Sequence, residues 1–175
     1  MVAADRERWD RRHAAVDPPG PMPPDALRGR PDLLPSGGRA LDMACGRGAV
    51  AVWLALRGFD VDAVDVSPVA VAAGAASAEA HGVRVRWHAA DLDDGLPAGI
   101  WDVLVCQRFR DPALYPAMAA ALAPGGVLVL TVLSDVGDEG GRFRAVPGEL
   151  LSAFAGLEVL HHDERDGEAT LLARR

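Results

Sequence analysis

A glycine-containing segment, LDMACGRGA at residues 41–49, combines an acidic side chain with a turn suited to close backbone contact. Gly46 and Gly48 follow an apolar stretch and precede helix-like sequence, so backbone N–H groups at this turn can approach a ligand. Asp42 places a carboxylate just before the same turn. A second acid, Asp65, ends the next apolar stretch, where a carboxylate can accept both hydroxyls of a ribose. The pattern predicts a nucleoside-binding site.

The carboxylate of Asp42 distinguishes between classes of nucleoside. A dinucleotide places an anionic pyrophosphate against the glycine loop, where a neighbouring carboxylate is electrostatically unfavourable. S-adenosylmethionine carries no phosphate, and both its ammonium and its sulfonium are positive. Residues 44–49, ACGRGA, also depart from the dinucleotide fingerprint G-x-G-x-x-G. Both features favour S-adenosylmethionine over a nicotinamide dinucleotide.

The segments around this loop alternate between strand-like and helix-like patterns. Parallel strands are expected at 39–45, 60–66, 83–89, 101–106 and 125–133, because these runs are almost continuously apolar. Helices are expected near the N-terminus, at 48–57, at 68–80, after Asp111 and near Pro147. The last residues, 157–175, are typical of an antiparallel hairpin with a tight turn at RDGE.

The ordered series of motifs resembles the class I S-adenosylmethionine-dependent methyltransferases, more narrowly the small tellurite-resistance type. It comprises LDMACGRG, VDAVDVSP, WHAADLDD, WDVLVCQRF and LAPGGVLVLTV, and the resemblance extends from Arg39 to the end. It implies a doubly wound, Rossmann-like α/β fold with seven strands in the order 3-2-1-4-5-7-6, mostly parallel with an antiparallel last strand. We expect an N-terminal helix and Pro/Gly-rich covering arm at residues 1–38, and the cofactor-binding methyltransferase domain at residues 39–175.

The resemblance also implies a set of residues in contact with S-adenosylmethionine. They are Arg12, Asp42, Ala44, Cys45, Gly46, Gly48, Asp65, Val66, Asp91, Leu92 and Gln107. The glycine loop is expected to wrap the methionine part, with Asp65 at the ribose and Asp91 at the adenine amino group. Ala44 stands where many relatives have glycine. The N-terminal WDRRHA is similar to the family's W-D-x-R-Y, so Arg12 is expected to approach the methionine carboxylate.

Methyl transfer from a sulfonium requires the acceptor to lie in line with the methyl group and water to be excluded, and it demands no metal. If the acceptor is a hydroxyl or thiol, His13 in the covering arm is the candidate general base. Arg108 and Arg110 follow the fourth predicted strand, and Arg142 and Arg144 follow the fifth. They are candidates to bind an anionic acceptor through forked hydrogen bonds, although ordinary surface charge explains them equally well.

Charge and the lack of extra domains favour a small-molecule acceptor over nucleic acid or protein. The chain has 25 acidic residues against 18 basic ones, a net charge of −7, which argues against nucleic acid as the main partner. The apolar runs are too short for a membrane span, and the start has no apolar signal region, so a cytoplasmic location is expected. Two alternatives are a non-catalytic S-adenosylmethionine-binding module and, less favoured, a nicotinamide-dependent reductase. Neither the accepting atom nor the oligomeric state is readable from the sequence.

Overall fold

A computed structural model describes residues 3–15, 20–137, 140–141 and 143–175. The chain forms two compact units, one comprising Met1–Pro23 and Gly37–Ala98 and the other Pro24–Ser36 and Gly99–Arg175. The boundary predicted at residue 38, between a covering arm and a single domain, stays a prediction. No helix in the described part of the chain is long and apolar enough to cross a bilayer.

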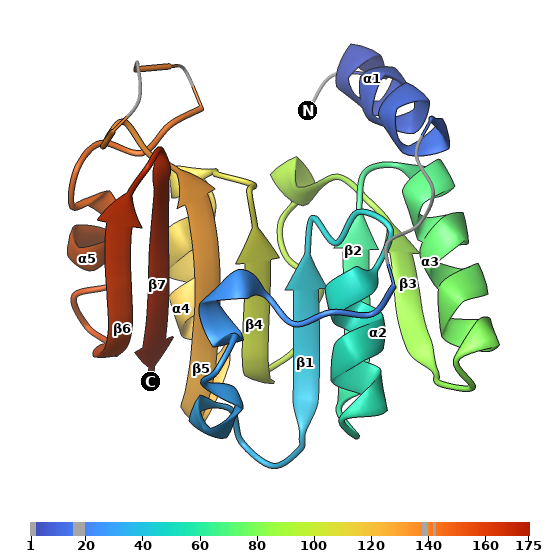
Figure 1. Ribbon diagram of the computed structural model, residues 1–175, viewed down its shortest axis with the longest axis horizontal. Helices are drawn as coiled ribbons and strands as arrows, with labels where there is room; N and C mark the ends of the chain where they lie inside the picture. Colours follow the sequence, from blue (N-terminus) through green and yellow to red (C-terminus); the bar gives the residue numbers. More distant parts are fainter. Residues whose placement is uncertain (1–2, 16–19, 138–139, 142) are drawn as a thin grey trace. The chain divides into compact units, whose positions relative to one another are not determined.

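The first unit is a three-stranded parallel layer with helices packed on it (Figure 1). Its elements are α1 (Ala3–Ala14), β1 (Arg39–Met43), α2 (Ala49–Leu56), β2 (Asp60–Asp65), α3 (Pro68–Ala80), β3 (Val85–Ala89) and the 3-10 turn η3 (Leu92–Asp94). Ser67 starts α3 as predicted, because its Oγ accepts a hydrogen bond from the Ala70 N–H at 3.1 Å and Pro68 occupies the first turn. α1 packs against α3.

Trp87 fixes the packing of α2 and α3 in this unit. Its indole ring occupies the space beside two glycines: a Cβ on Gly48 would lie 2.3 Å from the ring, and a Cβ on Gly74 would lie 2.5 Å from it. Gly48 also has a φ of 77°, which favours glycine. The second glycine of the loop is therefore required by packing and backbone geometry before any ligand is considered.

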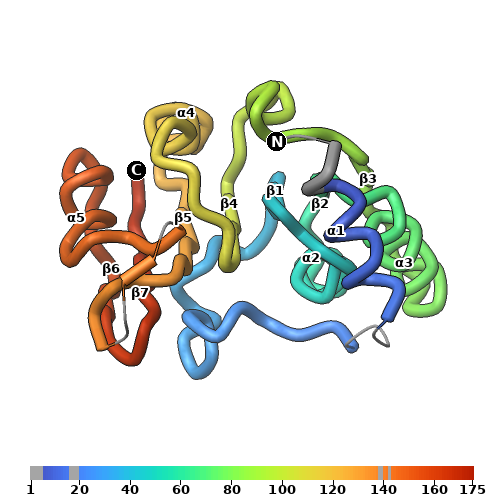
Figure 2. Tube along the Cα trace, turned by 90° about the horizontal axis from the view of Figure 1, so that it is seen from above, coloured from blue at the N-terminus to red at the C-terminus, as the bar shows by residue number. Residues whose placement is uncertain are grey.

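The second unit contains the remaining strands. Its elements are η1 (Asp25–Leu27), η2 (Pro31–Leu33), β4 (Trp101–Gln107), η4 (Pro112–Leu114), α4 (Tyr115–Ala120), β5 (Leu122–Leu133), α5 (Glu149–Ala153), β6 (Glu158–Arg165) and β7 (Glu168–Arg174). β4 and β5 are parallel, whereas β7 is antiparallel to both β5 and β6. Figure 2 shows α4 and α5 on the same side of these strands. The predicted hairpin is confirmed, with Asp166 and Gly167 both at positive φ in its turn.

Across the described residues, the strands form a seven-stranded sheet in the order β3-β2-β1-β4-β5-β7-β6. The predicted fold class and strand order are confirmed. Two details differ from the prediction. β5 begins at Leu122 and not at 125, because Leu122 already pairs with Trp101 before a register shift lets Val127 pair with Val103. The helix expected after Asp111 is a 3-10 turn followed by the short α4, although Asp111 caps it by accepting from the Ala113 N–H.

Candidate functional site

The glycine loop joins β1 to α2 through an unusually tight backbone. Ala44, Gly46 and Gly48 all have positive φ, at 49°, 52° and 77°. The Cys45 N–H donates to the Val64 carbonyl of β2 at 3.0 Å, which ties the loop to the neighbouring strand. The loop is therefore a fixed feature of the unit and presents backbone at the carboxyl ends of β1 and β2, where open α/β sheets bind their ligands.

Asp65, the predicted ribose acid, connects this loop to the next turn. Its Oδ2 accepts from the Gly46 N–H at 2.8 Å, and its Oδ1 accepts from the Ser67 N–H at 2.9 Å. The side chain is buried. A carboxylate oxygen has more than one lone pair, so acceptor capacity remains for ligand hydroxyls. Asp65 thus holds the glycine loop to the turn at Ser67 in the free protein, in addition to its predicted binding of a ribose.

Asp42 is a buried acid with an unused oxygen. Burial raises the pKa of Asp42 to about 8; the Ala51 backbone N–H opposes this rise, and the charge of Asp65 adds to it. Its Oδ2 has no hydrogen-bond partner among the described residues. The carboxyl group is therefore protonated at neutral pH in the free protein. A cationic ligand group beside it would stabilise the ionised form.

The thiol of Cys45, in the same loop, remains protonated. Burial raises its pKa well above the ordinary value, and the charges of Asp42 and Asp65 raise it further. The Sγ lies 3.6 Å from the Gly46 carbonyl, to which it donates. Cys45 and Cys106 are both free cysteines and belong to different units. A protonated thiol is a poor nucleophile, and the predicted cofactor contact of Cys45 stays a prediction.

α1 lies over the glycine loop. The His13 ring stacks on Trp9 with 5.9 Å between centroids, and its Cε1 would lie 3.4 Å from a Cβ on Gly46. Asp10 accepts a hydrogen bond from the Ser67 hydroxyl and so ties α1 to the start of α3. Burial lowers the pKa of His13, although the charge of Asp65 opposes this. The imidazole is therefore neutral at pH 7, the state that a general base requires.

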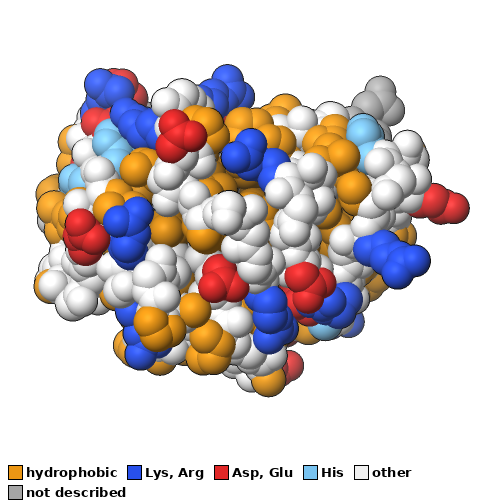
Figure 3. Space-filling model, turned by 90° about the horizontal axis from the view of Figure 1, so that it is seen from below, with side chains coloured by type: hydrophobic (Ala, Val, Ile, Leu, Met, Phe, Trp, Pro, Cys, Tyr) orange, Lys and Arg blue, Asp and Glu red, His pale blue; other side chains and the backbone are white. Residues whose placement is uncertain are grey.

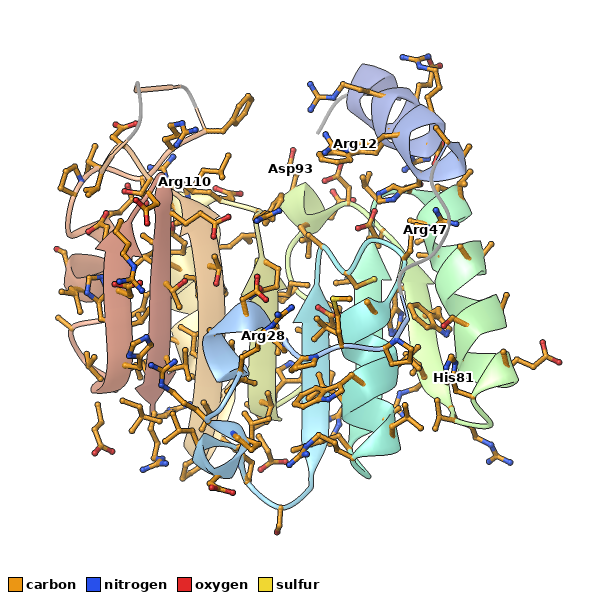
Figure 4. All side chains as sticks on the ribbon, viewed as in Figure 1. Arg12, Arg28, Arg47, His81, Asp93 and Arg110 are labelled. Atoms are coloured by element: carbon orange, nitrogen blue, oxygen red, sulfur yellow. The ribbon has the colours of Figure 1, made fainter. Side chains whose placement is uncertain are left out.

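Two arginines near this loop have different surroundings (Figure 4). Arg12 is an exposed residue of α1, and its guanidinium lies 5.4 Å from the centroid of the Trp9 ring. Arg47 lies in the loop below α1, and its Nε and Nη1 are buried without a hydrogen-bond partner among the described residues. The sequence reasoning did not select Arg47. Its position between Gly46 and Gly48, in a turn predicted to bind a ligand, could have identified Arg47 as a site residue.

The other predicted residues of the first unit lie at the ends of β2 and β3. Val66 and Leu92 are buried. The Asp91 Oδ1 accepts from the Asp93 N–H at 3.0 Å and so caps η3. The Ala90 N–H donates to the Asp65 carbonyl at 3.0 Å, which joins the two strand ends. The structure thus brings Asp91 and Leu92 to the end of the layer that also carries Asp65.

The predicted residues of the second unit already have protein partners. The Gln107 amide donates to the Cys106 carbonyl at 3.1 Å. Arg108 pairs with Glu168 at 2.8 Å, and Arg110 forms a forked pair with Glu149 at 2.7 and 2.6 Å. An anionic acceptor would have to displace these carboxylates, and the acceptor-binding function of both arginines stays a prediction.

Two further arginines were proposed with them. Arg144 donates to the Ser134 carbonyl at 2.6 Å, and Arg142 lies outside the described residues. The partner of Arg110, Glu149, was not predicted from the sequence, and it also accepts from the Tyr115 hydroxyl at 3.0 Å.

Among the described residues, no group of three or more His, Cys, Asp or Glu is placed to hold a metal ion.

Comparison with known proteins assigns this site to a family. Residues 40–126, which contain the glycine loop, Asp65 and Asp91, match the family described as "Methyltransferase domain". Ribosomal protein L11 methyltransferase of Bordetella parapertussis is 41% identical over 110 residues, which cover 61% of this chain and 35% of that protein. The chain belongs to the class I S-adenosylmethionine-dependent methyltransferases. The family expected from the sequence is therefore confirmed.

The names of the relatives of this chain indicate different substrates. Ubiquinone biosynthesis O-methyltransferase of Xanthomonas axonopodis pv. citri is 33% identical over 109 residues, or 58% of this chain and 46% of that protein. Among solved structures, TehB from Haemophilus influenzae has the same fold, with a TM-score of 0.75 at 21% identity over 86% of this chain and 61% of that one. The chain spans 35% to 56% of the length of the first curated relatives that it matches.

Proposed function

We propose that this chain transfers a methyl group from S-adenosylmethionine to a small-molecule acceptor. The observation that carries the proposal is the unpartnered, buried Oδ2 of Asp42 beside a glycine loop that Asp65 holds in place. An amino-acid ammonium would give Asp42 the cationic partner that it lacks in the free protein. The residues fit the cofactor, because an acid for the ammonium and an acid for the ribose belong to the same unit.

The chemistry of the bound cofactor is simple. When bound, S-adenosylmethionine supplies a methyl group on a sulfonium, already activated for in-line displacement by the acceptor. The chain orients the cofactor and excludes water. The glycine loop holds the methionine end, Asp65 binds the ribose, and Asp91 and Leu92 contact the adenine. His13, neutral at pH 7, removes the proton of a hydroxyl or thiol acceptor. α1, which carries His13, is the covering element that excludes water.

The small-molecule acceptor is supported by charge. The chain has a net charge of −7, and the site contains Asp65 and Asp91, both unfavourable neighbours for a polyanionic backbone. Figure 3 shows basic and acidic side chains interspersed on the face away from the carboxyl ends of β1 and β2. The names of relatives include methyltransferases of a ribosomal protein, of ribosomal RNA and of ubiquinone biosynthesis, so macromolecular acceptors belong in the test.

Calorimetric titration tests the cofactor first. Purified protein is titrated with S-adenosylmethionine, S-adenosylhomocysteine and NADH, and the series is repeated with Asp65→Asn and the control Asp94→Asn. Asp94 is an exposed acid of η3. We expect binding of the first two ligands only, weakened at least tenfold by Asp65→Asn and unchanged by Asp94→Asn. Binding of NADH, or of none of the three, refutes the proposal.

The acceptor is then identified with methyl-labelled S-adenosylmethionine. Parallel reactions contain a library of small phenols, thiols, amines and carboxylates, a ribosomal RNA fragment, and a ribosomal protein. Transfer to a library member, abolished by His13→Ala if that acceptor is a hydroxyl or thiol, supports the proposal. Transfer to RNA or protein alone retains the methyltransferase activity but refutes the small-molecule acceptor.

A further inference from the structure

The guanidinium of Arg47 is half-buried, and two of its nitrogens have no hydrogen-bond acceptor in the described part of the chain. Its Nε and Nη1 are both inaccessible and unpartnered. A guanidinium keeps its charge in proteins, and a buried charge without hydrogen bonds is energetically unfavourable. An anionic ligand group at this point would supply the missing acceptors.

The two unpartnered polar groups of the loop have opposite character. Asp42, at the end of β1, has a free carboxyl oxygen, and Arg47, just before α2, has free N–H donors. They flank the same turn and belong to one unit. An α-amino acid end carries one ammonium and one carboxylate on adjacent atoms. The loop is therefore complementary to a zwitterion and not only to a cation.

We propose that Arg47 binds the carboxylate of the methionine end of S-adenosylmethionine through its planar N–H fork. The inference rests on the proposed cofactor and adds the residue that selects for the carboxylate. It competes with the expectation that Arg12 does so. Arg12 is exposed, so water can accept its hydrogen bonds. Its Cζ also lies over the Trp9 ring, 5.4 Å from the ring centroid, in a cation–π contact. Arg47 is the better placed of the two, since only its donors are buried and unpaired.

The experiment compares two ligands that differ only in the carboxylate. S-adenosylmethionine and decarboxylated S-adenosylmethionine are titrated calorimetrically into the wild type, Arg47→Met, Arg47→Lys, Arg12→Met and the control Arg84→Met. Arg84 is an exposed arginine immediately before β3. We expect the wild type, Arg12→Met and Arg84→Met to prefer the carboxylated ligand by about 10- to 100-fold. Arg47→Met should bind both ligands alike, and Arg47→Lys, which keeps the charge but not the fork, should retain part of the preference.

Each other outcome has a distinct meaning. If the wild type binds neither ligand, the proposed function itself fails. If Arg47→Met keeps the wild-type preference, or Arg12→Met loses it, the assignment of the carboxylate to Arg47 is overturned. Equal weakening of both ligands by Arg47→Met shows a merely structural function and also overturns it. Urea unfolding of the free proteins checks integrity, and if Arg47→Met does not fold, an unchanged preference in Arg47→Lys decides against the proposal.

Discussion

Ala44 holds the least favourable backbone conformation of the glycine loop. Its φ of 49° lies in the left-handed region, where a Cβ is disfavoured by about 1 kcal/mol or more. We expect Ala44→Gly to stabilise the protein by about 0.5–1 kcal/mol, because relief of this strain exceeds the added flexibility of the unfolded chain. Urea denaturation measures the change. Ala51→Gly, in the first turn of α2, is the control and should destabilise the protein. A less stable Ala44→Gly variant would contradict the left-handed geometry.

Asp42 makes stability depend on pH in the opposite sense to an ordinary paired carboxylate. Its pKa is raised from 3.8 to about 8 by burial, so between these values the folded state binds a proton that the unfolded state has released. The contribution of Asp42 to the free energy of unfolding is fully present below pH 4 and is lost as the pH rises through about 8. Asp42→Asn carries no titrating proton, so its stability relative to wild type should increase by a few kcal/mol from pH 5 to pH 9.

The measurement for Asp42 is a set of urea unfolding curves between those pH limits. A control, Asp94→Asn, removes an exposed acid of η3 and should follow the wild-type curve. Parallel curves for wild type and Asp42→Asn would show that Asp42 titrates normally. The same substitution should weaken S-adenosylmethionine binding. Asp42 would then lower the stability of the free protein at pH 8 and at the same time provide the site for a cationic ligand group.

A polar contact among the described residues attaches helix α1 to the rest of its unit. Asp10 accepts from the Ser67 hydroxyl, while Ser67 also caps α3 and donates its backbone N–H to Asp65. A continuous set of hydrogen bonds therefore runs from the covering helix to the predicted ribose acid and on to Gly46. Because α1 carries His13, its attachment affects both cofactor access and the position of the proposed base.

Asp10→Ala should release α1 without removing the cap of α3. A hydrogen bond to a carboxylate contributes about 1.5–3 kcal/mol, so opening of the helix should increase about tenfold or more. Trypsin reports this directly, because α1 contains several arginines and they are cleaved only when the helix opens. The control is Glu7→Ala, which removes an exposed ion pair with Arg11 of 3.9 Å. Equal cleavage rates in Asp10→Ala and wild type would mean that Asp10 does not hold α1.

The strands and helices were predictable because each has a local cause. Apolar runs gave the parallel strands, and Ser67 with Pro68 and Asp111 with Pro112 marked the helix starts that the structure shows. The details that failed depend on partners distant in the chain. The early start of β5 requires pairing with Trp101, a contact that no periodicity within residues 122–126 reveals.

The site was predictable only as far as its motifs extend. The structure brings Asp42, Gly46, Asp65 and Asp91, which were predicted as one group, to one end of one unit. Their ligand contacts stay predictions. Arg47 and Glu149 were not predicted as site residues. Arg47 is distinguished by its buried nitrogens and Glu149 by its pairing with Arg110, and the sequence alone shows neither feature. Gly48 was selected for a ligand, yet Trp87 already requires it.

Ligand binding should stabilise the whole molecule by an amount set by mass action. S-adenosylhomocysteine at 100 times its Kd adds about 2.7 kcal/mol, which raises the Tm of a protein of this length by about 5–10 °C. NADH at the same concentration should leave Tm unchanged. Circular dichroism measures the transition, and repetition with Asp65→Asn tests whether the shift requires the proposed site.

Hydrogen exchange then locates the stabilisation. Asp42, Gly46, Asp65 and Asp91 all lie in the first unit, so amides of β1, β2 and the glycine loop should gain the most protection. The β6–β7 hairpin belongs to the second unit and should gain only the protection that accompanies global stabilisation. If the hairpin were protected first, or if NADH matched S-adenosylhomocysteine, the ligand would bind elsewhere than at the loop, because stabilisation is largest where the bound state removes local opening.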